Sequence, residues 1–416
     1  MGRTIDVDTV PIMNERRFCN ALTSTGERID PAVRDGRFVQ PDSLADEAER
    51  IDLDGLLVVP GFVDGHIHLD KSFVGDRWHP HRAAGSLRER LAIEKRLLAD
   101  AGPVAARCEA LLAQAHAFGT VAMRSHVDID ANIGLAHLHA VMAVCERWQD
   151  RIAVQLVAFP QQGILSSPGT AELLDEAIGQ GASVVGGLDP STFDGDAEAH
   201  LDVVFGIAER RDADVDIHLH EHGAGGIRQL ERIAMRTAAA GLGGRVTVSH
   251  AYALGDVPID EARRAAAVLA RAGVSIMTNA PGEHPFPPIA TLRDEGVHVF
   301  AGNDNIRDAW WPFGDADPLE RAMLIAYRSG WRTDAELATA LELVTGAPAR
   351  TLGLPAQGFD IGDEATFVVL SAPNVAAAVA APRDDRVLVQ RGDIVPREQV
   401  SMVQRLAQRH GTDAPS

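Results

Sequence analysis

The sequence predicts an α/β protein built on a parallel (β/α)8 barrel of the TIM-like type. Short apolar strands alternate with helical segments from about residue 56 to about residue 304. Each strand ends in polar residues, and glycines such as Gly119 and Gly273 follow several of the helical segments. Strands that alternate with helices pair in parallel, so eight such units favour a closed barrel, with a doubly wound open sheet as the competing topology.

The predicted strands share an apolar body and a polar carboxyl end. In chain order they are Val63–His68, Val121–Asp128, Ile152–Gln162, Val184–Asp189, Val215–Glu221, Val246–His250, Val274–Asn279 and Val297–Asp304. Apolar residues recur with helical spacing between them, for example in Pro103–Phe118, Leu135–Trp148 and Ile259–Ala272. Because barrel enzymes carry their chemistry at the carboxyl ends of the strands, the polar residues there are the candidate site.

The two ends of the chain lack this repeat. They contain the short β-like runs Leu56–Val59, Ala365–Leu370 and Arg386–Val389, whereas residues 1–50 are weakly patterned. We expect both ends to pair into one small β-sandwich domain beside the barrel. The predicted domains are therefore residues 1–58 and 355–416, which form the two parts of the β domain and a tail, and residues 59–354, which form the barrel.

The composition is that of an ordinary globular protein, with 46% hydrophobic and 24% charged residues in a chain of 416. Its formal net charge of −20 disfavours nucleic acid and anionic membranes as partners. Only three cysteines occur, without a CxxC pair, which argues against a disulfide framework. No basic segment followed by an apolar one opens the chain, and no apolar run approaches ~18 residues. We therefore expect a cytoplasmic protein.

The tripeptide His66-Ile67-His68 ends the first predicted strand. Residues i and i+2 of a strand point to the same face, so the two imidazoles can bind one metal ion. Two hydrogen-bonded histidines near a turn are the competing interpretation. A catalytic mononuclear site needs three or four protein ligands and an open position. His218, His250 and Asp304 end later strands and can complete such a site.

Several segments resemble the amidohydrolase superfamily, specifically its cytosine deaminase-like branch. Val59–Asp70 resembles the strand-one motif of that family, and Val157–Leu165 resembles the segment that carries a base-recognising glutamine. Ser249-His250 and Gly302–Gly314 resemble the motifs of strands six and eight. The resemblance covers residues 56 to 370, and these motifs are highly specific in combination.

The resemblance implies a role for each matching residue. The metal ligands would be His66, His68, His218 and Asp304, holding one divalent ion per subunit, zinc or iron. His250 would hydrogen-bond the attacking hydroxide or the substrate, Asp304 would also accept a proton, and Glu221 would shuttle a proton to the ring. No lysine ends the fourth predicted strand, which favours one metal over two.

The resemblance also implies substrate contacts. Gln161 would pair with the edge of the heterocycle, although Gln162 beside it could serve instead, and Trp310 would wall the pocket. Lys71 and Asn305 depart from cytosine deaminases and resemble the s-triazine N-alkylaminohydrolases of the same branch, and the segment around Asp189 resembles that subgroup too. Those enzymes tend to have aspartate where this chain has Glu221.

Other polar residues near the predicted strand ends have competing interpretations. His220 and His222 share strand parity with His218, and His126 is interpreted as a hydrogen-bond partner of a ligand. Arg307 and Asp308 are interpreted as structural. The Pro-rich segment 283–288 is interpreted as a rigid loop that either covers the pocket or serves the fold alone.

The predicted function is metal-dependent hydrolytic deamination of a cytosine-like nitrogen heterocycle, with release of ammonia from the amine-bearing ring carbon. The alternatives are an s-triazine aminohydrolase that releases an alkylamine, similar to N-isopropylammelide hydrolysis, and a cyclic amide hydrolase. A non-enzymatic scaffold is disfavoured because every expected ligand position is filled. The expected partner is a small heterocyclic molecule, and the resemblance implies a homo-oligomer.

Overall fold

The computed structural model describes residues 15–85, 87–282, 284–355 and 358–396. At its centre is a parallel eight-stranded sheet, with strands β8 (Phe62–Ile67), β9 (Thr120–Asp128), β10 (Ala153–Phe159), β11 (Val184–Leu188), β12 (Asp214–Leu219), β13 (Val246–His250), β14 (Val274–Thr278) and β15 (Val299–Ala301). The strands pair in chain order, and a bridge between Ile67 and Asp304 links the last strand to the first. The predicted barrel is confirmed, and each predicted strand overlaps an observed one.

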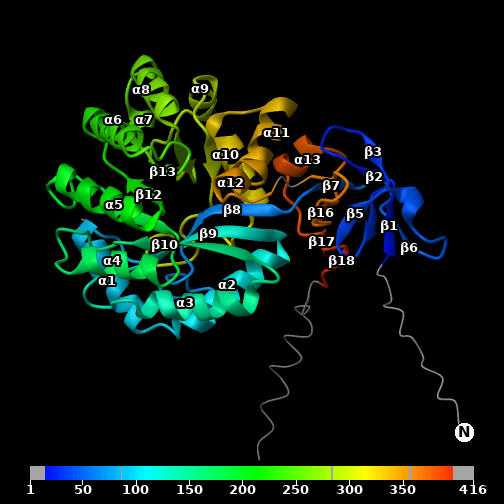
Figure 1. Ribbon diagram of the computed structural model, residues 1–416, viewed down its shortest axis with the longest axis horizontal. Coiled ribbons are helices and arrows are strands. Elements are labelled where there is room, and N and C mark those ends of the chain that lie inside the picture. The colour runs from blue at the N-terminus through cyan, green and yellow to red at the C-terminus, as the bar shows by residue number, and fades with distance from the viewer. Residues whose placement is uncertain (1–14, 86, 283, 356–357, 397–416) are drawn as a thin grey trace, which may run out of the picture.

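Helices separate the strands and cover the outside of the barrel (Figure 1). They are α1 (Leu87–Ala99), α2 (Val104–Ala117), α3 (Ala136–Trp148), α4 (Thr170–Gly179), α5 (Ala197–Arg211), α6 (Gly223–Ala240), α7 (Ala253–Asp256), α8 (Ile259–Ala272), α9 (Ile289–Asp294), α10 (Pro318–Ser329), α11 (Asp334–Glu342), α12 (Gly346–Thr351) and α13 (Val375–Ala380). The three helical stretches quoted from the sequence correspond to α2, α3 and α8. Covered by helices on one side and by core side chains on the other, strands β8, β9, β11, β13 and β14 are buried at every residue.

Two glycines allow the barrel to close between β8 and β15. A Cβ atom on Gly302 would lie 2.4 Å from the backbone nitrogen of His66, and one on Gly65 would lie 2.4 Å from a ring carbon of Phe300. Neither position can hold a side chain without moving its neighbour. The close approach lets the backbone N–H of Asp304 donate to the His66 carbonyl at 2.7 Å, which places these two residues side by side.

The chain ends form two further sheets beside the barrel (Figure 1). Their strands are β1 (Glu15–Cys19), β2 (Ala21–Leu22), β3 (Arg28–Ile29), β4 (Ala32–Arg34), β5 (Arg37–Val39), β6 (Glu49–Asp52), β7 (Leu57–Pro60), β16 (Phe367–Leu370), β17 (Arg386–Gln390) and β18 (Asp393–Ile394), with one 3-10 turn at Pro41–Ser43. One sheet has the order β5-β4-β1-β6 and the other β18-β17-β16-β7-β2-β3. The three predicted β-like runs are β7, β16 and β17, and the weakly patterned region supplies β1 to β6. The exact domain boundaries stay a prediction.

Aromatic rings fill the space between these two sheets. The ring of Phe367 on β16 lies 5.2 Å from that of Phe18 on β1 and 6.1 Å from that of Phe38 on β5, measured between centroids. All three side chains are buried. Edge-on and offset ring pairs add to the hydrophobic stabilisation of such a core. The predicted β-sandwich from both chain ends is thereby confirmed.

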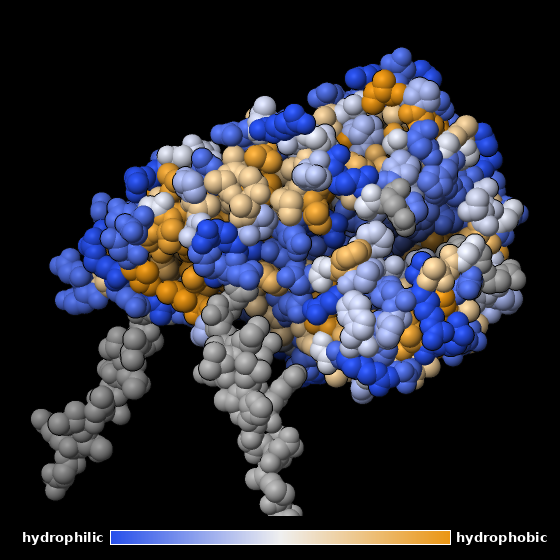
Figure 2. Space-filling model, turned by 180° about the vertical axis from the view of Figure 1, so that it is seen from behind, coloured by the Kyte–Doolittle hydropathy of each residue, from blue (hydrophilic) through white to orange (hydrophobic). Residues whose placement is uncertain are grey.

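The molecular surface is polar over most of the face shown in Figure 2. Apolar residues on this face gather chiefly toward the end that holds the chain-end sheets, and the exposed apolar side chains of those sheets include Val387 and Ile394. Within the described residues, no helix combines the length and apolar character needed to cross a membrane.

A buried ion pair fastens the chain-end sheets to the barrel. Arg386 on β17 donates two hydrogen bonds to Asp317, at 2.7 and 2.6 Å, and both side chains are almost fully buried. Asp317 also caps α10 by accepting from the backbone nitrogen of Leu319. The same carboxylate thus serves the helix start and the junction between the two parts of the fold.

We predict that Arg386→Leu lowers the free energy of unfolding by about 3–5 kcal/mol, because it leaves the Asp317 carboxylate buried without its counter-ion. Chemical denaturation of the purified variants measures this change. The matched control is Arg383→Leu, since Arg383 forms an exposed pair with Asp385 and its loss should cost much less. Equal costs for the two variants would contradict the role given to the buried pair.

Candidate active site

A cavity of about 750 Å³ opens at the carboxyl ends of the barrel strands. This volume lies within the range of about 300–1,000 Å³ that is usual for small-molecule sites. Its walls come from the ends of all strands except β9, and from the loops that follow them. The site thus lies where the strand pattern predicted it.

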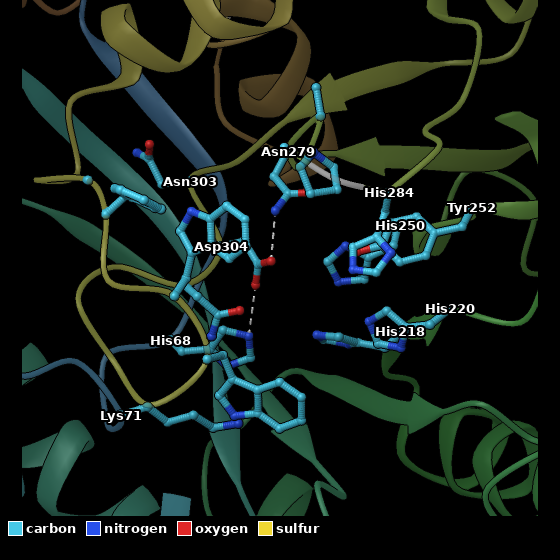
Figure 3. Close-up of a pocket in the computed structure, with 18 of the residues that line it drawn as sticks. His68, Lys71, His218, His220, His250, Tyr252, Asn279, His284, Asn303 and Asp304 are labelled. Atoms are coloured by element: carbon cyan, nitrogen blue, oxygen red, sulfur yellow. Dashed lines mark hydrogen bonds and ion pairs between the residues drawn. The ribbon is translucent and has the colours of Figure 1, made fainter. Parts of the chain in front are cut away.

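The predicted ligands meet at the floor of this cavity. His66, His68 and His218 each offer a nitrogen, and these atoms lie within 4.8 Å of one another. His66, His250 and Asp304 form a second group under the same limit, so the two groups share His66. Figure 3 shows His68 and Asp304 on one side of the cavity floor and His218 and His250 on the other, facing one another.

The donor atoms fit a divalent metal ion. Among the described residues, His66 Nε2, His250 Nδ1 and both ring nitrogens of His218 are buried without a hydrogen-bond partner. Such unpaired buried nitrogens are costly unless a ligand binds them. Burial lowers the pKa of His68 to about 4 and lowers the pKa values of His218 and His250 well below their usual range. Neutral imidazoles with one carboxylate are a donor set that suits zinc or iron.

Asp304 is held in place from two sides. Its Oδ1 lies 3.5 Å from His66 Nε2 and 3.3 Å from His68 Nε2, and its Oδ2 accepts a hydrogen bond from Asn279 Nδ2 at 2.9 Å. Burial alone would raise the pKa of Asp304, but the nearby rings of His66 and His68 hold the pKa of this carboxyl well below its usual value. The sequence marked Asn279 only as a strand end, without a role.

A chain of hydrogen bonds orients the His66 ring. Its Nδ1 lies 3.0 Å from Ser249 Oγ, which donates to Asp216 Oδ1 at 2.7 Å. Arg124 donates to the other oxygen of Asp216 at 2.9 Å. With Nδ1 occupied in this way, Nε2 of His66 is the nitrogen left to face the cluster, as outer hydrogen bonds commonly arrange for metal-binding histidines.

His126 does not play the hydrogen-bonding role predicted for it. Its ring stacks on that of His66, with centroids 3.9 Å apart, and neither of its nitrogens has a hydrogen-bond partner within the described part of the chain. His126 therefore supports the ligand His66 by ring packing. Strand parity placed it on the correct face but could not distinguish packing from hydrogen bonding.

The position of Glu221 argues against the proton-shuttling role predicted for it. Glu221 is absent from the described residues that line the cavity, and its Oε1 accepts hydrogen bonds from the backbone nitrogens of Ser191 and Thr192, at 2.8 and 2.7 Å. The reason is local: β12 ends at Leu219, so strand alternation no longer directs the residues beyond it. Glu221 thus holds the loop after β11.

His220 faces the cavity where Glu221 was expected. Its Nδ1 lies 2.9 Å from Asp189 Oδ2, and its backbone nitrogen donates to Asp189 Oδ1 at 2.6 Å. The ring stacks on His250, with centroids 4.6 Å apart. Asp189 lines the cavity, as predicted, but both of its oxygens are occupied by His220, so His220 is the better placed of the two to meet a ligand.

The other predicted substrate contacts also line the cavity: Lys71, Gln161, Asn305 and Trp310. The amide of Asn305 donates to Asp308, and the indole of Trp310 donates to Glu94 Oε1 at 2.6 Å. Gln162 is not among the lining residues, which decides between the two neighbouring glutamines in favour of Gln161. Asp308 has the predicted structural role, because it also accepts from the backbone nitrogens of residues 310 and 311.

Further wall residues come from loops that no motif marked. Tyr252 stacks on His284 with ring centroids 5.0 Å apart, and both line the cavity with Gly282. The loop predicted at 283–288 thus contributes to the wall, and Glu283 lies outside the described residues. Trp311 and Phe313 add apolar surface from the segment after β15. Loop residues have no periodicity, so only their aromatic character could have suggested them.

Backbone strain is concentrated at the same residues. His250 has a backbone φ of 73° and Asp304 has one of 61°, values that residues other than glycine rarely adopt. Each such residue costs on the order of 1–3 kcal/mol, and such strain is typical of functional sites. His250 is the last residue of β13 and Asp304 follows the end of β15 by three residues, and both side chains belong to the cluster.

Comparison with known proteins gives the family. The model of the family described as "Amidohydrolase family" matches residues 81–400. The N-isopropylammelide isopropyl amidohydrolase of Pseudomonas sp. strain ADP is 31% identical over 360 residues, which cover 85% of this chain and 89% of that protein.

Two solved structures extend the match. The crystal structure of N-isopropylammelide isopropylaminohydrolase from Burkholderia multivorans aligns with a TM-score of 0.88 and 39% identity, over 92% of this chain and 98% of the other. That of 5-methylcytosine deaminase from Klebsiella pneumoniae, liganded with 5-fluorocytosine, aligns with a TM-score of 0.80 and 27% identity, over 92% and 98%. The chain with this barrel and this cluster of histidines therefore belongs to the amidohydrolase family.

Proposed function

We propose that this protein is a metal-dependent hydrolase that removes a substituted amino group from an oxo-substituted heterocycle of the s-triazine class. The observation that carries the proposal is the cluster of His and Asp donors at the floor of a cavity that can hold a flat ring. Gln161 and Asn305 offer amide groups to the ring edge, and Trp310 offers an aromatic wall. The two relatives named for N-isopropylammelide support this substrate class.

A cytosine-like ring with ammonia as the leaving group is the second candidate, supported by the similarity to 5-methylcytosine deaminase. Two features favour the substituted amine. Lys71 and Asn305 occupy the positions at which the sequence resembles triazine enzymes, and Trp311 and Phe313 provide apolar surface against which an alkyl group can pack.

In the proposed reaction, one divalent ion, zinc or iron, would be held by His66, His68, His218 and Asp304. When bound, the ion supplies Lewis acidity that makes water a nucleophile near neutral pH. Asp304 Oδ2 already accepts from Asn279, so Oδ1 is the oxygen free to take a proton from the attacking water. His250, which groups with His66 and Asp304 and has a buried Nδ1 atom, can hydrogen-bond the oxygen that adds to the ring.

The overall change is hydrolysis of one carbon–nitrogen bond. Water adds to the ring carbon that bears the exocyclic amine, and the carbon–nitrogen bond then breaks. The proton held at Asp304 passes to the departing amine. The second proton of the water moves from the added oxygen to the adjacent ring nitrogen, so the ring carbon keeps the new oxygen as an oxo group. His220 lies next to His250 by ring stacking and adds a second imidazole near the leaving group.

The first test is a product screen with metal-loaded protein. The compounds are N-isopropylammelide, ammelide, cytosine, 5-methylcytosine and isocytosine, and isopropylamine and ammonia are measured in parallel. We expect isopropylamine from N-isopropylammelide, and we expect Asp304→Asn to abolish its release. Ammonia from a pyrimidine without isopropylamine would replace the proposal by the second candidate. A new carboxylate product would indicate ring-amide hydrolysis instead.

We predict that His218→Ala loses most of the bound metal, because it removes a neutral nitrogen ligand from the floor of the cavity. Metal content per chain, measured by elemental analysis, gives the result independently of turnover. The matched control is His139→Ala, which alters an exposed histidine on α3. A His218→Ala protein with unchanged metal content would show that the ligand set is wrong.

We predict that Glu221→Gln loses less than about tenfold in kcat/KM, which corresponds to about 1.4 kcal/mol. The amide oxygen of glutamine can still accept from the backbone nitrogens of Ser191 and Thr192. By contrast, loss of a general acid or base typically costs 10²–10⁴-fold, and we expect a loss of that size for His250→Ala. A Glu221→Gln enzyme as slow as His250→Ala would restore the proton-shuttling role predicted from the sequence.

A further inference from the structure

Lys71 is an unusual residue in this chain. It is one of only two lysines, and its side chain is 2% exposed, whereas Lys95 on α1 lies at the surface. The ammonium group of Lys71 donates to Gln161 Oε1 at 2.6 Å and contacts Asp128 Oδ1 at 2.9 Å, and Glu94 Oε1 lies 3.8 Å away. Figure 3 shows its side chain extended along the bottom of the cavity.

We propose that Lys71 is a positioning residue that locks the side-chain amide of Gln161 with its NH2 group toward the substrate. The enzyme would thereby select rings that present a hydrogen-bond acceptor, such as an oxo group, at that position. This inference rests on the proposed function and adds to it the residue that decides which ring edge is accepted.

The argument starts from the chemistry of the ammonium group. A lysine ammonium has three N–H donors and no acceptor, so it can face only the oxygen of a neighbouring amide. The oxygen and nitrogen of a glutamine amide are usually hard to tell apart, but a donor-only neighbour settles the orientation. Gln161 Nε2 therefore points away from Lys71, and Gln161 is one of the residues that line the cavity.

The surrounding carboxylates keep the Lys71 side chain in its charged ammonium form. Burial by itself would lower the pKa of Lys71, but Asp128 and Glu94 raise it above its usual value. Both carboxylates are buried, so they would lack a counter-ion if the ammonium were absent. These neighbours therefore favour the charged form of Lys71.

The Glu94 carboxylate also connects Lys71 to Trp310 in the wall of the cavity. Glu94 Oε1 accepts from Trp310 Nε1 at 2.6 Å while lying 3.8 Å from the Lys71 ammonium. One network thus fixes the ring that flanks the substrate and the amide that meets its edge. A substrate placed against Trp310 meets a Gln161 amide that cannot rotate to suit it.

The consequence is discrimination between ring edges. An oxo group or a bare ring nitrogen can accept from the fixed NH2 group, whereas an amino group or a ring N–H places donor against donor. Leaving buried donors unpaired should reduce kcat/KM for the wrong ring by roughly tenfold to a hundredfold. Without Lys71 the amide can rotate through 180° and present its oxygen, so this preference should weaken.

The test compares two rings that differ at one position, N-isopropylammelide and N-isopropylammeline, in which an amino group replaces one oxo group. We expect the wild type to prefer the oxo ring, and we expect Lys71→Met to reduce the kcat/KM ratio of the two by about tenfold or more. The change should lie mainly in KM. Lys95→Met is the matched control and should leave the ratio unchanged.

Two further variants separate positioning from a general loss of structure. The double variant Lys71→Met/Asp128→Asn removes one of the carboxylates that Lys71→Met alone leaves without a counter-ion. It replaces the single variant if that variant folds poorly, and it should show the same loss of preference. In a Gln161→Leu background, Lys71→Met should have no further effect on the ratio, because Lys71 acts through Gln161. A ratio unchanged by Lys71→Met, or equally changed in the Gln161→Leu background, would overturn the inference.

Binding of both rings to metal-loaded protein, measured by calorimetry, distinguishes failure of this inference from failure of the proposed function. If neither ring is hydrolysed but the wild type binds the oxo ring more tightly and Lys71→Met does not, the proposed function is wrong and the inference stands. If isopropylamine is released but the preference does not depend on Lys71, the inference is wrong and the proposed function stands. If neither ring binds, both are overturned.

Discussion

Closure of the barrel between β8 and β15 is the constraint on which the site depends. His66 and His68 come from one side of this junction and Asp304 from the other, and the hydrogen bond from the Asp304 backbone to the His66 carbonyl sets their separation. Gly65 and Gly302 make the approach possible because neither position has room for a Cβ atom. Backbone geometry thus holds this cluster of buried donor residues together before any side-chain contact contributes.

Around this junction the buried polar groups of the described residues are of two kinds: some hydrogen-bond one another, and others are ring nitrogens without a partner. Ser249, Asp216 and Arg124 form an outer hydrogen-bonded chain that orients His66, while Asn279 fixes Asp304. The nitrogens that face the cavity are left without partners. Buried polar groups are normally paired, so a set of unpaired nitrogens next to hydrogen-bonded supporting residues is typical of a site preorganised for a metal ion. The strained backbone at His250 and Asp304 belongs to the same pattern.

The side of the cavity that meets the substrate follows a different principle. There, Lys71, Asp128 and Glu94 form a buried charged network whose members mostly contact one another, with Gln161 and Trp310 at its two ends. Charges buried in this way contribute little net stability, but they restrict the orientations of the groups they bond. The fixed amide and the aromatic wall are therefore where ring selection can arise.

Much of this architecture could be predicted from the sequence. Apolar runs and helical patterns predicted the eight strands and the helical segments between them, and the resemblance to a known family implied that His66, His68, His218 and Asp304 would meet. These features depend on residues close in sequence or on the ordered return of parallel strands. The sequence could not show that Glu221 turns to the backbone of Ser191 and Thr192, that His126 stacks instead of hydrogen-bonding, or that Lys71 bonds Gln161. Those outcomes were decided by the tertiary structure alone, because in each case the partner comes from a segment distant in the sequence.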